Sequence, residues 1–221
     1  MRRGYRARDG RIRSQWRRVQ AAPGILRTWA VRLAVILSLL AAGLPIARAS
    51  DRARLVDPPA SIPDFTLIDQ QGRPFSAGDL RGHVGLVFFG FTNCMGICPA
   101  TLQVLRQATR ELGPDAADLR IVLISVDPAR DTPAAMQAFL APFGAGFVGL
   151  TGEPADLRRV ADGFGAVYFK GMPRPADGYD VEHTSQVYLV DRDGRMRAIF
   201  QGAGSGEIAS VARPVLQETV R

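Results

Sequence analysis

Cysteine and histidine are scarce in this chain of 221 residues, which contains two of each. The cysteines, Cys94 and Cys98, lie four residues apart, and the histidines are His83 and His183. Two neighbouring cysteines exclude a small scaffold held together by several disulfides. Four soft or borderline ligands also leave little room for elaborate metal chemistry, since one structural zinc site alone takes four.

Acidic residues are nearly absent from the first 49 positions. This part has eleven arginines against one acidic residue, Asp9, and carries a net charge of +10, whereas residues 50–221 carry 17 basic and 20 acidic residues, a net charge of −3. The overall charge of +7 therefore belongs to the leader. Because a nucleic-acid binder needs positive charge on its folded surface, we exclude that function.

The leader has the three parts of a secretory signal peptide. An arginine-rich region precedes Leu33–Ala47, an apolar run of 15 residues, and Ala47-Arg48-Ala49 then supplies a small-residue cleavage pattern. We expect cleavage after Ala49. An uncleaved membrane anchor is the alternative, although a 15-residue helix of about 22 Å is short for a bilayer core of about 30 Å.

The charge of the leader also predicts the compartment. Positive charge ahead of an apolar run holds the N-terminus inside and sends the rest of the chain across the membrane. We therefore expect the folded part outside the cytosol, in the bacterial periplasm, either soluble or anchored to the inner membrane. An arginine-rich start is also typical of mitochondrial presequences, so the mitochondrial intermembrane space is the alternative.

The length predicts one domain of about 150 residues plus an extension. With 47% hydrophobic and 22% charged residues, the composition is that of a globular protein. We expect a leader at 1–49, a linker at 50–60 because this stretch is charged and contains Pro58 and Pro59, and one domain at 61–221.

Strands and helices alternate along the predicted domain. Continuous apolar runs, capping residues and turn residues predict strands at 65–68, 74–75, 85–91, 119–126, 147–150, 181–190 and 196–200, and helices at 99–112, 133–141, 153–164 and 206–219. Residues 165–180 are expected to form a long loop. The alternation predicts an α/β fold with a central sheet and helices on both faces.

The two cysteines lie between the predicted strand 85–91 and the following helix, the thioredoxin-like place for a dithiol. Cys94 and Cys98 can approach each other at this spacing, and a helix start favours the thiolate. They can cycle as a redox-active, catalytic pair that forms a disulfide, or they can bind a metal. Thiol–disulfide oxidoreductases usually have C-x-x-C, and the extra residue here gives room for a metal with a third ligand from elsewhere. Copper(I) accepts such thiolate ligands.

His183 is the candidate third ligand, because the start of its predicted strand lies next to the dithiol in a thioredoxin-like sheet. His83 precedes its strand at the opposite end of the sheet, so we interpret it as a surface residue. Ser185 stands near the position where thioredoxin-like redox enzymes carry a cis-proline, which weakens an enzymatic interpretation.

Three segments together resemble the Sco/SenC family: Phe88–Pro99 with both cysteines, Ser125–Pro133 with the pattern S-V-D-P-x-R-D-T-P, and Glu182–Leu189 with the histidine. The resemblance covers about residues 60–219. It implies a thioredoxin-like fold with an added N-terminal β-hairpin. It also implies that one copper ion, copper(I) or copper(II), is bound by Cys94, Cys98 and His183.

The chain departs from the family pattern at two places. Met95-Gly96 stands where the family often has Pro-Asp, and Glu182 stands where Asp is common. We interpret Met95 as a residue at the lip of the site rather than a ligand.

The D-P-x-R-D-T segment has a structural interpretation of its own. We expect Asp127, Arg130 and Asp131 to form a turn with an ion pair ahead of a helix cap at Thr132.

The resemblance implies a copper metallochaperone that helps to assemble the binuclear copper site of cytochrome c oxidase. Its expected partners are the copper-site subunit of that oxidase, other copper chaperones or thiol reductants, and a membrane reached through the leader. The alternative is an extracytoplasmic thiol–disulfide oxidoreductase that cycles Cys94 and Cys98. A peroxidase is disfavoured, because the peroxiredoxin pattern Pro-x-x-x-Thr-x-x-Cys is absent.

Overall fold

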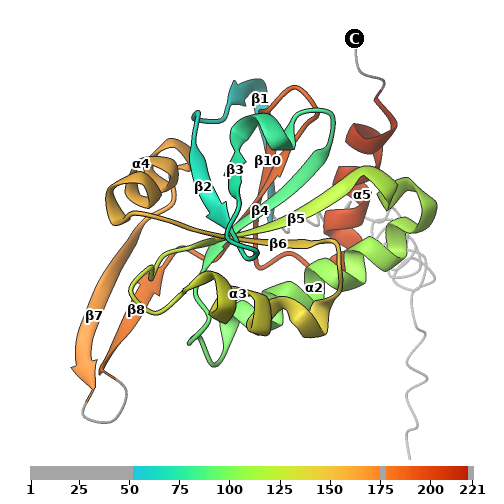
Figure 1. Ribbon diagram of the computed structural model, residues 1–221. Coiled ribbons are helices and arrows are strands. Elements are labelled where there is room, and N and C mark those ends of the chain that lie inside the picture. Colours follow the sequence, from blue (N-terminus) through green and yellow to red (C-terminus); the bar gives the residue numbers. More distant parts are fainter. Residues whose placement is uncertain (1–51, 175–177, 219–221) are drawn as a thin grey trace, which may run out of the picture. The chain divides into compact units, whose positions relative to one another are not determined.

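The computed structural model of this protein describes residues 52–174 and 178–218. A sheet of eight strands in the order β1-β10-β9-β4-β5-β6-β2-β3 forms the centre of the described part, and strands β7 and β8 pair separately. Figure 1 shows the large sheet with helices around it and the β7–β8 hairpin projecting from one side. The predicted α/β fold with a helix-flanked central sheet is confirmed.

Strands β4, β5 and β6 form the parallel centre of the large sheet. β4 (Val84–Gly90) is buried along its whole length, and β5 (Leu119–Ser125) and β6 (Phe147–Thr151) are mostly buried. Their largely apolar sequences, interrupted in β5 by Arg120, are typical of strands that are covered on both faces. β9 (Gln186–Val190) pairs with β4 on the other side in antiparallel direction.

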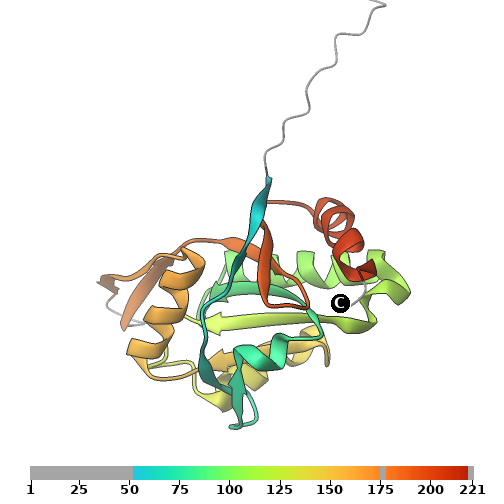
Figure 2. The same ribbon diagram turned by 90° about the horizontal axis from the view of Figure 1, so that it is seen from above.

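Helices cover both faces of this sheet, as Figures 1 and 2 show. Phe89 of β4 packs edge-on against Phe164 of α4, with ring centroids 5.5 Å apart, whereas its neighbour Phe88 points to the opposite face, where α2 lies. The helices are α2 (Ile97–Leu112), α3 (Pro133–Leu140), α4 (Pro154–Phe164) and α5 (Ser205–Gln217), with short 3-10 turns η1 (Ala77–Leu80), η2 (Gly113–Asp118) and η3 (Ala141–Phe143).

The predicted N-terminal hairpin is present. β2 (Thr66–Asp69) and β3 (Pro74–Ser76) pair in antiparallel direction around a turn in which Asp69 accepts hydrogen bonds from the backbone of Gln71 and Arg73. β2 also pairs with β6, so the hairpin extends one edge of the large sheet.

The interpretation of residues 50–60 as a linker is wrong. Residues Ala53–Ser61 form β1, which pairs in antiparallel direction with β10 (Arg195–Gln201) at the other edge of the sheet. The register shifts between Leu55 and Ala60, at the prolines that suggested a linker. An edge strand tolerates proline because its outer N–H groups need no partner in the sheet.

The prediction of a long loop at 165–180 is also wrong. β7 (Tyr168–Arg174) and β8 (Gly178–His183) form an antiparallel hairpin there. The predicted strand 181–190 is consequently two strands, because His183 ends β8 and Gln186 begins β9 in the other sheet.

The predicted leader, 1–49, lies outside the described residues. Within the ranges 52–174 and 178–218, no helix is long and apolar enough to cross a membrane.

A substitution at Gly90 can test how closely α2 packs against the end of β4. A Cβ atom at this position would lie 3.0 Å from Cys98 Sγ and 2.9 Å from Phe88. We therefore expect Gly90→Ala to lower the free energy of unfolding by about 1–3 kcal/mol, measured by urea unfolding of the reduced, metal-free protein. Gly146→Ala is the control, because its Cβ would contact nothing within 4 Å. Equal stability of the two variants would contradict the close packing.

Candidate metal centre

The two cysteines lie on either side of the start of α2. Cys98 is fully buried in the first helical turn, and Cys94 is half-buried in the loop that follows β4. The Cys98 backbone N–H donates a hydrogen bond of 3.3 Å to Cys94 Sγ, so this sulfur accepts from one of the free N–H groups at the helix start. Both cysteines are free thiols in this structure.

His183 reaches the same place from the end of β8. Its ring packs edge-on against Phe88 and Phe91, with centroids 6.1 and 5.7 Å away. Nδ1 lies 3.0 Å from the carbonyl oxygen of Thr184, which can only accept, so Nδ1 carries the proton. Nε2 therefore presents its lone pair to Cys98 Sγ, 3.6 Å away. Such a hydrogen bond on the far nitrogen is what fixes the orientation of histidine ligands in metal sites.

The structure thus brings Cys94, Cys98 and His183 together. Their ligand atoms all lie within 4.8 Å of one another, and no other group of this kind occurs in the described part of the chain. Two sulfurs and one imidazole suit a soft or borderline cation. The set is one ligand short of the four that a structural zinc site takes.

Burial sets the charge of the metal-free site. Desolvation, followed by the hydrogen bond with Cys94, raises the pKa of the Cys98 thiol far above its ordinary value. Desolvation also lowers the pKa of His183 below its ordinary value, which keeps the imidazole neutral at pH 7. A cation entering the site must therefore displace a proton from Cys98, but none from His183.

His83 does not take part in this site. It is half-buried rather than fully exposed, and Arg120 Nη2 lies 2.8 Å from its Nε2. It precedes β4, at the end of that strand opposite the cysteines.

The D-P-x-R-D-T segment forms the expected turn and ion pair. Arg130 pairs with the buried carboxylate of Asp127, and Thr132 caps α3 by accepting from the Ala135 N–H. Asp131 is not in the ion pair. It accepts hydrogen bonds from the loop before Cys94, a connection that the sequence pattern did not predict.

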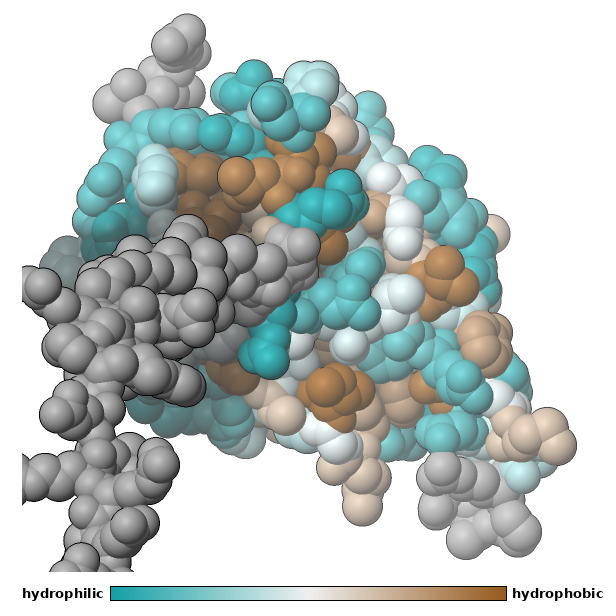
Figure 3. Space-filling view, turned by 180° about the vertical axis from the view of Figure 1, so that it is seen from behind, coloured by the Kyte–Doolittle hydropathy of each residue, from teal (hydrophilic) through white to brown (hydrophobic). Residues whose placement is uncertain are grey.

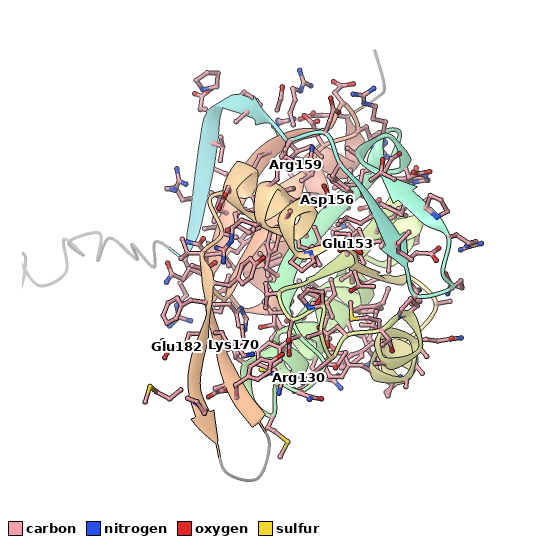
Figure 4. The ribbon with its side chains drawn as sticks, turned by 60° about the vertical axis from the view of Figure 1, so that its left-hand side comes forward. Arg130, Glu153, Asp156, Arg159, Lys170 and Glu182 are labelled. Carbon is pink, nitrogen blue, oxygen red and sulfur yellow. The ribbon has the colours of Figure 1, made fainter. Side chains whose placement is uncertain are left out.

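Several residues around the site lie at the surface. Met95 is 98% exposed, in keeping with its interpretation as a lip residue. Ser185 is half-buried and lines a cavity of about 170 Å³ with Ile97 and Val104 of α2. Glu182 lies on the outer side of the β7–β8 hairpin in Figure 4. Figure 3 shows hydrophobic side chains in separate patches among hydrophilic ones on the face opposite to that of Figure 1.

The different burial of the two thiols predicts different reactivity. In the reduced, metal-free protein at pH 8, we expect iodoacetamide to modify Cys94 at least about tenfold faster than Cys98. The thiolate is the nucleophile, and each unit by which burial raises the pKa of Cys98 lowers the thiolate fraction of this residue about tenfold. Fragmentation mass spectrometry of the peptide that contains both residues distinguishes the two products. Equal rates would contradict the buried position of Cys98.

Comparison with known proteins agrees with this geometry. The SCO1/SenC family model matches residues 54–216. An SCO2-like protein of Rickettsia conorii is 38% identical over 133 residues, which are 60% of this chain, and the chain spans 65% of that relative's length.

Two solved structures show the same fold. Bradyrhizobium japonicum ScoI with copper bound is 35% identical and aligns with a TM-score of 0.65, covering 71% of this chain and 99% of its own. BsSco, a member of the Sco family of cytochrome c oxidase assembly proteins in which a disulfide switch was identified, is 27% identical with a TM-score of 0.61, covering 75% and 99%. The family match covers most of the chain and includes all three residues of the candidate centre, and the chain belongs to the SCO1/SenC family.

Proposed function

We propose that this protein is a copper metallochaperone that binds one copper ion through Cys94, Cys98 and His183. The observation that carries the proposal is the convergence of three ligand atoms within 4.8 Å. The donor set supports copper, since thiolates and imidazole bind both copper(I) and copper(II). A relative with 35% identity and the same fold has been solved with copper bound.

The accessibility of the site supports transfer rather than storage. Cys94 and His183 are half-buried, and Met95 beside them is almost fully exposed. Three protein ligands leave copper open to a further ligand, so a recipient can exchange its own ligands for these one at a time. We propose the copper-site subunit of cytochrome c oxidase as the recipient, with other copper chaperones or thiol reductants as further partners. The description of BsSco as one of the oxidase assembly proteins supports this choice.

We also propose that the folded part works outside the cytosol, in the bacterial periplasm, with the mitochondrial intermembrane space as the alternative. The signal-like composition of residues 1–49 supports export. The proposed boundaries are a leader up to Ala49 and one copper-binding domain behind it, which includes β1.

A second candidate function is thiol–disulfide exchange. The two sulfurs are near enough for a disulfide to form after modest movement, with two electrons and two protons passing to the disulfide of a partner that is thereby reduced. The raised pKa of Cys98 makes this thiol a poor nucleophile, so the half-buried Cys94 would make the first attack in such an exchange.

Copper stoichiometry separates the two candidates. We expect the reduced protein to retain one equivalent of copper after desalting and to show thiolate-to-copper(II) absorption. His183→Ala should lose the bound copper, whereas His83→Ala, which removes the histidine at the opposite end of β4, should retain it. The measurements are metal analysis and visible absorption.

Two results would overturn the proposal. Retention of copper by His183→Ala at the parent affinity would remove His183 from the ligand set. A parent protein that holds no copper but cycles a disulfide readily would leave thiol–disulfide exchange as the function.

The pKa shifts predict how copper affinity depends on pH. Cys98, whose pKa burial raises, must lose a proton on binding, whereas the lowered pKa of His183 leaves it neutral from pH 7 upward. Between pH 7 and pH 8 we therefore expect the apparent association constant to rise about tenfold for each proton released. Competition with a chelator of known pH dependence measures this rise. An affinity that does not change with pH would contradict thiolate ligation.

A further inference from the structure

The two segments that carry the candidate ligands have little regular structure to hold them. Residues 92–96, which include Cys94, form neither helix nor strand. The β7–β8 hairpin, which ends in His183, pairs with no strand of the large sheet. β9 of the large sheet begins three residues after His183 and limits where this residue lies, but side-chain contacts of the two segments also bear on the distance between Cys94 and His183. Both segments contact the same short loop, residues 127–131, between β5 and α3.

One end of the 127–131 loop holds the cysteine segment. Asp131 is 0% exposed, and its Oδ1 accepts hydrogen bonds from the backbone N–H of Thr92 at 3.0 Å and from Thr92 Oγ1 at 2.6 Å. Its Oδ2 accepts a hydrogen bond of 2.6 Å from Ser125 Oγ at the end of β5. A buried carboxylate with all these partners ties the chain two residues before Cys94 to the sheet.

The other end of the 127–131 loop holds the hairpin. Tyr179 of β8 donates a hydrogen bond of 2.5 Å from its hydroxyl to Asp127 Oδ1, and Asp127 is 4% exposed. Arg130 pairs with Asp127 Oδ2 and donates from Nη1 to the Tyr179 carbonyl oxygen at 3.1 Å.

The Tyr179 ring also makes cation–π contacts. The Arg130 guanidinium lies over the ring at 4.0 Å from its centroid, and Lys170 Nζ lies over it at 3.6 Å. Lys170 and Arg130 lie on the side of the hairpin that faces the domain in Figure 4. The start of β7 is held separately, where Arg158 of α4 donates to the Tyr168 carbonyl oxygen and stacks on its ring.

The hydrogen bonds set the position of His183 through the pleat of β8. Tyr179, Val181 and His183 are alternate residues, so their side chains lie on one face of the hairpin. Fixing Tyr179 against the loop therefore fixes the side of the hairpin from which His183 reaches Cys98.

We propose that the 127–131 loop positions the metal ligands, with Asp131 fixing the cysteine segment and Asp127 with Arg130 fixing the histidine segment through Tyr179. In this proposal none of these groups contacts the metal. The expected effect on copper release rests on the proposed copper binding. Groups that orient metal ligands in this way commonly change affinity about 10–100-fold when they are removed.

Asp127→Asn tests the histidine side, and Asp191→Asn is its matched control. Asp191 is also an aspartate in a turn, 3% exposed and paired with Arg195 and Arg197, but it follows β9 at the end opposite the cysteines. In the metal-free protein we expect Asp127→Asn to speed the alkylation of Cys98 about fivefold over the control, since a displaced His183 no longer covers this thiol. In the copper-loaded protein we expect copper release to a chelator to be about tenfold faster.

Thr92→Val tests the cysteine side, and Thr109→Val is its matched control. Thr109 also donates its hydroxyl proton, to the Leu105 carbonyl oxygen within α2, away from the 127–131 loop. We expect Thr92→Val to speed the alkylation of Cys94 about fivefold and copper release about tenfold over this control. Tyr179→Phe, which removes only the hydroxyl bond, replaces Asp127→Asn if urea unfolding shows that the latter does not fold.

The proposal would be overturned if Asp127→Asn and Thr92→Val both matched their controls in the rate of thiol alkylation and in the rate of copper release. The failure of the proposed function is distinguishable, because a parent protein that holds no copper removes that function while the metal-free alkylation rates still decide whether the loop positions the ligands.

Discussion

The close approach of the first turn of α2 to the end of β4 is the constraint on which the candidate centre depends. Gly90 has no side chain, and Cys98 Sγ takes the space that a Cβ would need. The approach buries the Cys98 thiol and keeps it protonated. It also places Cys94 at the helix start, within reach of the Cys98 N–H. A Cys98 thiol that is protonated without metal and must ionise when a metal binds follows from this packing contact.

Buried aspartates at or just after the ends of strands recur in this fold. Asp69, Asp127 and Asp191 are all buried, follow or end a strand, and pair with an arginine three or four residues later. At Asp69 and Asp191 the carboxylate also accepts backbone N–H groups and closes a local turn. At Asp127 one oxygen accepts instead from the distant Tyr179, so this buried aspartate joins two parts of the fold.

Local signals in the sequence account for what could be predicted. The apolar run of β4, the cysteines behind it and the proline in the first turn of α2 are close in sequence, so their arrangement followed from periodicity and capping rules. β1 and the β7–β8 hairpin could not be found in this way. β1 is stabilised by pairing with β10, and β7 and β8 are stabilised by pairing with each other. Pro58 and Pro59 interrupt the strand pattern of β1, and Gly171 and Pro173 interrupt that of β7. The link between Asp127 and Tyr179 was missed for the same reason, since it requires the hairpin. The place of its predicted strand and the resemblance both pointed to His183, but neither predicted that the rings of Phe88 and Phe91 pack against it.

The register of the β7–β8 hairpin limits which changes in length the protein can accept. His183 lies four positions after Tyr179, so both side chains lie on the face of the hairpin toward the domain, whereas Glu182, opposite Phe169, lies on the other face. One residue inserted between Tyr179 and His183 would place Glu182 at the register position that His183 now occupies, and one residue deleted there would place Thr184 at that position. Changes in length before Gly178 leave the parity of this stretch intact. The chain can therefore vary in length ahead of β8, but the step of four positions from Tyr179 to His183 is fixed by the geometry of the pleat.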